Sequence, residues 1–201
     1  MRTYAFFKNY KNDIFLLEFY PKISKLTKMN IALLGFMGAG KTIIGTLLAE
    51  LMDYQFIDLD RYIENRFKTS VADIFATKGE SGFRDFEKTA LTQVLRYKNV
   101  VVATGGGTPC FFDNIEQINQ SATSIYLQFS PEILATRIRF DTTGKRPLVK
   151  EQTFEELVEF TRIKLEQRES YYMQAHITVS LPVATPYEIA DLLFRKIQTQ
   201  R

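Results

Sequence analysis

The sequence has one cysteine, no long apolar run, and little net charge for its 201 residues. Cys110 has no second cysteine to pair with, so an intrachain disulfide is excluded and a reducing, cytoplasmic compartment is expected. No apolar stretch approaches the roughly 18 residues of a transmembrane helix, so we expect no membrane partner. Internal repeats and low-complexity segments are also missing. Hydrophobic residues make up 45% and charged residues 24%, a balance typical of one globular domain.

The net charge of +3 is unevenly distributed. Residues 1–28 carry six cations and two acids, a net charge of +4, which leaves residues 29–201 with −1. A nucleic-acid-binding domain needs a basic face, and the net charge of residues 29–201 gives no support for one. We therefore expect no nucleic-acid partner.

Residues 1–28 also differ in composition, with seven of the 27 aromatic residues and no glycine. They show neither the apolar core nor the small-residue cleavage site of a secretory signal. We expect an N-terminal extension that the fold does not need, such as one that begins at an upstream start site. The alternatives are an interaction arm, a tether to a membrane surface, or an extra element packed onto the domain.

From residue 29 onward, short apolar runs alternate with helical patterns. The runs predict strands at 31–34, 55–58, 100–103, 124–129 and 176–180. Apolar periodicity and helix-start signals predict helices at 41–52, 60–67, 71–78, 81–97, 153–173, and from 131 and 186 onward. This alternation predicts an α/β fold: a three-layer sandwich in which helices cover both faces of a parallel five-stranded sheet. Ligands of such folds bind at the carboxyl ends of the strands.

The first predicted strand runs into residues 35–42, Gly-Phe-Met-Gly-Ala-Gly-Lys-Thr, which match the phosphate-binding pattern G-x-x-x-x-G-K-[ST]. Glycines permit positive φ and a close approach, so the backbone N–H groups at Gly38, Ala39 and Gly40 are expected to face the phosphates of ATP. Lys41 is expected to neutralise the β- and γ-phosphates, and the Thr42 hydroxyl to bind Mg²⁺. The motif predicts ATP as a co-substrate.

Carboxylates follow the second predicted strand. Alternation along an extended chain would put Asp58 and Asp60 on one side, where one could serve a metal ion and the other an acceptor hydroxyl. Arg84 and Glu87 are three residues apart on a predicted helix, so they can pair and prepare the arginine for a substrate carboxylate. A solvated strand end and an ordinary surface pair are the alternatives for these two motifs.

Three glycines, Gly105, Gly106 and Gly107, follow the predicted strand 100–103 and let the backbone run close to a ligand, or form a flexible turn. In their order and spacing, these motifs resemble the shikimate kinase family over essentially all of residues 29–201. The matching segments are 35–42, Asp58-x-Asp60, Ala72-Asp73-Ile74-Phe75, Gly79-Glu80, Phe83-Arg84 with Glu87, Gly105-Gly106-Gly107, Lys145-Arg146-Pro147-Leu148, and Arg168 with Tyr171 and Tyr172.

The resemblance implies ATP-dependent phosphorylation of shikimate to 3-phosphoshikimate, a cytoplasmic step of aromatic amino-acid biosynthesis, by a monomeric enzyme. It implies that Asp58 holds Mg²⁺ through water and that Asp60 binds shikimate hydroxyls and acts as the base. Arg84, positioned by Glu87, and Arg168 would bind the shikimate carboxylate, and the three glycines would contact the ring.

The resemblance also implies a lid at about 140–152, which closes to exclude water. Arg146 in this lid would reach the transferring phosphoryl group, and Arg139 would stack on adenine. The pair Tyr171-Tyr172 leaves open which ring fills the single tyrosine position of the family. His176 and Cys110 are interpreted as structural.

Two other functions compete with this interpretation. Gluconate and nucleoside monophosphate kinases share the fold and the phosphate loop, but they lack the combination of Phe-Arg-x-x-Glu with three glycines. A catalytically silent nucleotide-binding module would be expected to lose Lys41, Asp60 or Arg146, and all three are present.

Overall fold

The computed structural model describes residues 30–140, 152–180 and 184–199 of the chain. Five strands form one sheet in the order β2-β3-β1-β4-β5, and every pairing is parallel. The strands are β1 (Asn30–Leu34), β2 (Gln55–Asp58), β3 (Val100–Ala103), β4 (Ala122–Gln128) and β5 (Ile177–Ser180). The predicted parallel five-stranded sheet is thereby confirmed.

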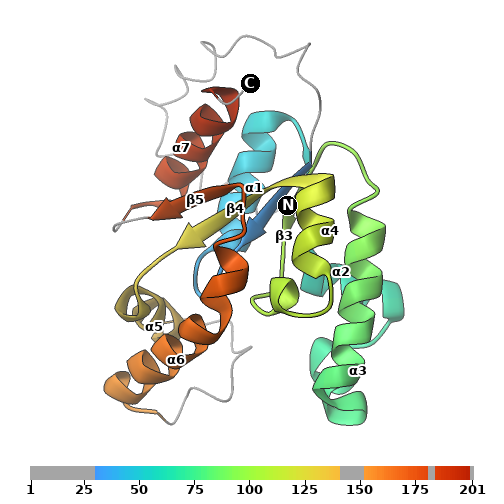
Figure 1. Cartoon of the computed structure of the whole chain (residues 1–201), viewed down its shortest axis with the longest axis vertical. Helices are drawn as coiled ribbons and strands as arrows, with labels where there is room; N and C mark the ends of the chain where they lie inside the picture. The colour runs from blue at the N-terminus through green and yellow to red at the C-terminus, as the bar shows by residue number, and fades with distance from the viewer. Residues whose placement is uncertain (1–29, 141–151, 181–183, 200–201) are drawn as a thin grey trace, which may run out of the picture.

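Helices cover both faces of this sheet, as the sandwich prediction requires (Figure 1). They are α1 (Lys41–Met52), α2 (Leu59–Phe67), α3 (Val71–Val94), α4 (Asn114–Ser121), α5 (Pro131–Arg139), α6 (Phe154–Tyr172) and α7 (Pro186–Thr199). Helix α1 lies behind the sheet in Figure 1 and packs against α7, whereas α4 and α6 lie in front of it. Among the described residues, no helix has both the length and the apolar character that crossing a bilayer requires.

The position of each strand in the sheet explains its composition. All residues of β1 and β3 are buried, because strands and helices surround them on every side. Edge strands β2 and β5 carry exposed or half-buried polar residues. The phosphate loop (residues 35–42) follows β1, and the glycine loop (residues 105–107) follows β3. Because β1 and β3 are neighbours, both loops lie at the same end of the sheet.

Helix α3 combines the two helices that were predicted at 71–78 and 81–97. Gly79 interrupts it with φ 66° and ψ −173°, a conformation that separates two helical arms and favours glycine. The N-terminal arm begins at Ser70, whose side chain accepts a hydrogen bond from the Asp73 N–H. The prediction of two helical segments was therefore right about the break, although the second arm ends at Val94 rather than at 97.

The sequence analysis missed α4 and a short 3₁₀ helix, η3 (Thr108–Cys110). Only Ile115 and Ile118 of α4 are buried apolar residues, which is too few for a clear helical period. Residues 1–28 and nearly all of the expected lid at 140–152, with Arg146, lie outside the described residues. The expectations for these two segments stay predictions.

Candidate active site

The phosphate loop joins β1 to α1 and has the backbone that its glycines predicted. Gly38 and Gly40 both have φ 82°, in the left-handed region that favours glycine. Gly40 is the N-cap residue of α1 and supplies no capping side chain. The N–H groups of the first helical turn are therefore left for an anion, which the positive end of the helix dipole also attracts.

Lys41 and Thr42 begin α1 directly beside this loop. The Lys41 ammonium group donates to the carbonyl oxygens of Gly35 at 2.7 Å and Phe36 at 3.0 Å, which holds the cation over the loop. The Thr42 hydroxyl donates to Oδ2 of Asp58 at 2.8 Å, while Oδ1 of Asp58 accepts from the N–H of Arg61 at 3.3 Å. Asp58 therefore caps α2 and also faces the phosphate loop, so the capping alternative and the metal-site prediction are compatible.

Asp58 and Thr42 fit Mg²⁺, because both offer the oxygen ligands that this ion prefers. Magnesium usually keeps several waters and is bound through one or two protein carboxylates plus substrate phosphates, so it needs no dedicated cage of protein ligands. Among the described residues, no group of three or more His, Cys, Asp or Glu side chains is arranged for a metal.

Asp60 lies in the first turn of α2, not in an extended strand. The prediction that Asp58 and Asp60 alternate along one extended strand was therefore wrong, because helix α2 already begins at Leu59. Asp60 nevertheless reaches the site: a Cβ atom added at Gly105 would lie 3.4 Å from its Oδ1. Asp60 keeps part of its surface open to solvent. The surrounding protein atoms nevertheless desolvate its carboxyl group, and together with the charges of Asp58 and Glu87 they raise its pKa to about 6, against a smaller opposing effect of Lys41.

Arg84 on α3 is the most constrained cation of the site. Its Nη1 donates to Oε2 of Glu87 at 2.8 Å and its Nη2 donates to Oε1 of Glu80 at 2.8 Å. The guanidinium carbon lies 4.0 Å from the centre of the Phe111 ring, a cation–π contact. Burial works to lower the pKa of Arg84, but the two glutamates outweigh it, so the pKa is raised and the group stays charged.

The predicted Arg84–Glu87 pair is thus present, and it is buried: Arg84 is 7% exposed and Glu87 0%. The second carboxylate oxygen of Glu87 accepts from the Thr108 hydroxyl at 2.6 Å. Both oxygens of Glu87 are therefore engaged, one by α3 and one by η3. Arg84 and Glu87 therefore form a buried, fully hydrogen-bonded carboxylate contact and not an ordinary surface ion pair.

The three glycines pack against the other parts of the site. A Cβ atom at Gly107 would lie 2.7 Å from Nη2 of Arg84, and one at Gly106 would lie 3.5 Å from Nη1 of Arg168 and 3.4 Å from the Met37 N atom. The glycine loop therefore lies between the two arginines and against the phosphate loop. A larger residue would displace these groups.

Arg168 approaches from α6, and its guanidinium lies 5.4 Å from the centre of the Phe36 ring. Of the two adjacent tyrosines, Tyr172 is the one that reaches the glycine loop: it is fully buried and its hydroxyl donates to the Gly106 carbonyl. Tyr172 also packs on Tyr126, with ring centres 4.9 Å apart.

Cys110 and His176 have surroundings that agree with structural roles. Burial raises the pKa of the Cys110 thiol to about 11, although the charges of Arg168 and Arg84 oppose this rise. His176 Nδ1 lies 3.0 Å from the Ser124 hydroxyl oxygen, and the backbone N–H of His176 donates to that oxygen at 2.9 Å. These contacts join the start of β5 to β4.

The structure does not bring every predicted residue to this site. Arg139 is the exposed last residue of α5, and its adenine contact stays a prediction. The residue of α5 that contacts the phosphate loop is Arg137, which donates to the Gly38 carbonyl at 3.5 Å and lies 4.1 Å from the Phe129 ring centre. Sequence reasoning missed Arg137, because its contact joins residues 99 positions apart and no local pattern indicates it.

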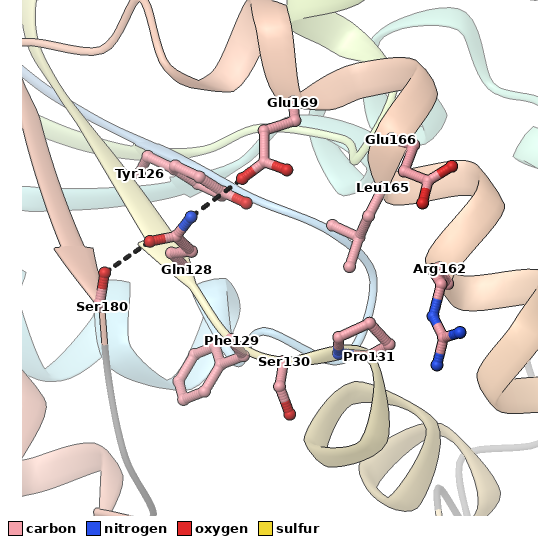
Figure 2. Close-up of a pocket in the computed structure, with 10 residues that line it drawn as sticks. All are labelled: Tyr126, Gln128, Phe129, Ser130, Pro131, Arg162, Leu165, Glu166, Glu169 and Ser180. Carbon is pink, nitrogen blue, oxygen red and sulfur yellow. Dashed lines mark hydrogen bonds between the residues drawn. The ribbon is translucent and has the colours of Figure 1, made fainter.

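A cavity of about 510 Å³ lies at the carboxyl ends of β4 and β5, and Tyr126 and Phe129 are among the residues that line it (Figure 2). None of the predicted site residues lines it. Figure 2 shows Gln128 between Glu169 and Ser180: its amide donates to Glu169 at 2.9 Å, and its carbonyl oxygen accepts from Ser180. These bonds tie β4 to α6 and β5, so we interpret the polar residues of this cavity as structural.

Three features lie at the same end of the parallel sheet: the phosphate loop, the Thr42–Asp58 pair beside it, and the buried Arg84. Together they define a P-loop phosphotransferase. The chain is also similar to known proteins of this class. The family model for shikimate kinase matches residues 37–198. A shikimate kinase of Azobacteroides pseudotrichonymphae is 43% identical over 168 residues, which cover 83% of this chain and 98% of the relative. One from Parabacteroides distasonis is 46% identical over 148 residues, covering 74% and 85%.

Solved structures agree with the sequence matches. The crystal structure of shikimate kinase from Bacteroides thetaiotaomicron has a TM-score of 0.79 at 36% identity, covering 85% of this chain and 98% of that chain. Shikimate kinase from Acinetobacter baumannii, solved in complex with shikimate, has a TM-score of 0.78 at 32% identity, covering 87% and 96%. The chain belongs to the shikimate kinase family, whose reaction is the ATP-dependent phosphorylation of shikimate in aromatic amino-acid biosynthesis.

Proposed function

We propose that this chain transfers the terminal phosphoryl group of ATP to shikimate through the residues gathered at the carboxyl ends of β1, β2 and β3. The observation that carries the proposal is the position of Arg84, a buried cation. Arg84 lies beside Gly107, and Gly105 of the same glycine loop lies beside Asp60. A buried guanidinium group next to the acceptor site suits a small acceptor that carries a carboxylate.

The donor half of the reaction rests on the phosphate loop. The loop N–H groups at Gly38, Ala39 and Gly40 and the Lys41 ammonium group bind the β- and γ-phosphates. Thr42 would hold Mg²⁺ directly and Asp58 through water, and the bound ion would neutralise charge on the phosphates. Arg139 would bind adenine, and Arg146 would bind the phosphoryl group from the lid.

The acceptor half rests on one acid and two arginines. Arg84 and Arg168 grip the shikimate carboxylate, and the backbone of Gly105, Gly106 and Gly107 lies against the ring. Asp60 hydrogen-bonds the attacking hydroxyl and accepts its proton. A pKa of about 6 leaves Asp60 ionised at neutral pH, yet basic enough to take a proton as the hydroxyl attacks.

We propose further that the enzyme acts as a cytoplasmic monomer without a nucleic-acid or membrane partner, and that residues 1–28 are dispensable. The single cysteine supports a cytoplasmic location, and the charge of −1 over residues 29–201 gives no support for nucleic-acid binding. A chain that begins at Met29 tests whether residues 1–28 are dispensable: its melting temperature and turnover should equal those of the full chain. Lower values would show that the extension packs on the domain or aids the reaction.

The test of the reaction is a coupled ADP-release assay with ATP and Mg²⁺, in which shikimate, gluconate and CMP are compared as acceptors. Turnover with shikimate alone supports the proposal. Turnover with gluconate or CMP would favour another small-molecule kinase, and ATP binding without turnover would favour a silent module.

The Arg84→Lys variant tests the acceptor site. Lysine keeps the charge but loses the fork that makes two parallel bonds, so the KM for shikimate should rise about 10- to 100-fold, while the KM for ATP changes less than about twofold. Equal effects on both substrates would contradict the assignment of Arg84.

A further inference from the structure

One hydrogen-bonding edge of the Arg84 guanidinium is only half filled. The Nε–H and one Nη2–H of an arginine form an edge that a carboxylate can grip with two parallel bonds. Here Nη2 donates to Oε1 of Glu80, whereas Nε is buried without a hydrogen-bond partner among the described residues. Glu80 therefore engages the nitrogen next to Nε, while Nε itself donates to no described group.

The rest of the guanidinium is fixed, so this edge cannot turn toward another group. Glu87 holds Nη1 at 2.8 Å, the Phe111 ring stacks at 4.0 Å, and Gly107 leaves no room for a side chain on its side. Buried donors in folded proteins nearly always have a partner. A carboxylate that binds Nε and Nη2 together would supply the partner that the described residues lack, and it would compete with Glu80 for Nη2.

Glu80 and Glu87 hold Arg84 very differently. The side chain of Glu87 is 1% exposed, whereas that of Glu80 is 60% exposed, so Glu80 can move into water with little loss. Glu80 also follows Gly79, the break between the two arms of α3, and a Cβ atom at Gly79 would meet no atom within 4 Å. The backbone next to Glu80 thus has room to adjust.

We propose that Glu80 is a placeholder for the substrate carboxylate. It binds Nη2 of Arg84 in the empty enzyme, and the shikimate carboxylate displaces it by binding Nη2 and Nε together. This rests on the proposed role of Arg84 as a shikimate ligand. Glu80 competes with every anion for this edge, and an acceptor that makes both bonds competes best.

The test compares the KM and Kd for shikimate in three variants of the full chain. Glu80→Gln removes the competing charge and should tighten shikimate binding about three- to fivefold. Asp85→Asn is the matched control, because it removes the same charge from an exposed position on the same helix arm and should change binding less than about 1.5-fold. Arg84→Lys should weaken shikimate binding, as above.

Three results would overturn the proposal. If Glu80→Gln and Arg84→Lys both bind shikimate more weakly than the wild type, Glu80 positions Arg84. The placeholder proposal is then wrong, whereas the proposed function stands. Equal tightening by Glu80→Gln and Asp85→Asn would show a general charge effect. No effect of Arg84→Lys on shikimate binding would overturn both this proposal and the assignment of Arg84.

A crystal structure of the enzyme with shikimate adds a direct readout. The proposal requires that the shikimate carboxylate contacts Nε of Arg84 and that Glu80 no longer lies within 3.5 Å of Nη2. A structure that retains the Glu80–Arg84 bond beside bound shikimate would refute it.

Discussion

The raised pKa of Asp60 predicts that neutralising this residue stabilises the protein while it abolishes activity. Burial, Asp58 and Glu87 raise the pKa from 3.8 to about 6. A carboxyl group with a higher pKa in the folded state than in the unfolded state destabilises the fold when it is ionised. This penalty is complete above pH 6, shrinks as the pH falls from about 6 to about 4, and is gone below that.

The full pKa shift corresponds to a ceiling of about 3 kcal/mol, at 1.36 kcal/mol per pKa unit. Asp60 is exposed, however, so solvent screens its repulsion from the other acids, and we expect about 1 kcal/mol. For a domain of this size, that free energy corresponds to a rise of about 2–4 °C in melting temperature. Asparagine keeps the shape of the side chain and removes the charge.

The assay is thermal unfolding of the wild type, Asp60→Asn and Asp85→Asn without nucleotide, between pH 4 and pH 8. Asp60→Asn should melt higher than the wild type at pH 7.5, and this difference should close as the pH falls from 6 to 4. Its turnover should fall at least about 100-fold, because the proposed general base is lost. A melting temperature at or below the wild-type value at pH 7.5, or a difference that does not depend on pH, would refute the reasoning.

Two further substitutions test the glycine loop. Gly107→Ala places a methyl group 2.7 Å from Nη2 of Arg84, so the KM for shikimate should rise at least about tenfold, with little change in the KM for ATP; parallel changes in both would show general damage. Tyr172→Phe keeps the buried ring but leaves the Gly106 carbonyl unpaired, which should cost about 1–3 kcal/mol of unfolding free energy in urea. Tyr171→Phe is the control, and an equal loss in both would contradict the assignment of Tyr172.

Much of the fold could be predicted because its signals are local. Strands β1 and β3 are buried on both faces, so their apolar runs are continuous, and the phosphate loop encodes its own turn through Gly38 and Gly40. Helix α4 and η3 escaped prediction, since they are short and make contacts with a distant segment, such as the hydrogen bonds from Thr92 to Gln117 and from Thr108 to Glu87.

The site was predictable where its partners are close in sequence and unpredictable where they are not. Arg84 and Glu87 are three residues apart on one helix, so spacing alone indicated their pairing. Phe111 and Thr108 reach this pair from a different segment, and no local pattern indicates such a contact. Strand alternation failed for Asp60, because the N-cap at Asp58 starts a helix one residue after the strand.

Two groups of the site lie in unfavourable surroundings within the protein. Asp60 carries a charge that its neighbours oppose, and Arg84 keeps a buried donor without a partner. In the proposed arrangement, shikimate supplies what each lacks: a hydroxyl that donates to the acid, and a carboxylate that accepts from Nε. Because both gains exist only when the acceptor is bound, binding energy and catalytic arrangement come from the same contacts. The acidity of Asp60 and the displacement of Glu80 should therefore be coupled through the acceptor, since one molecule must satisfy both at once.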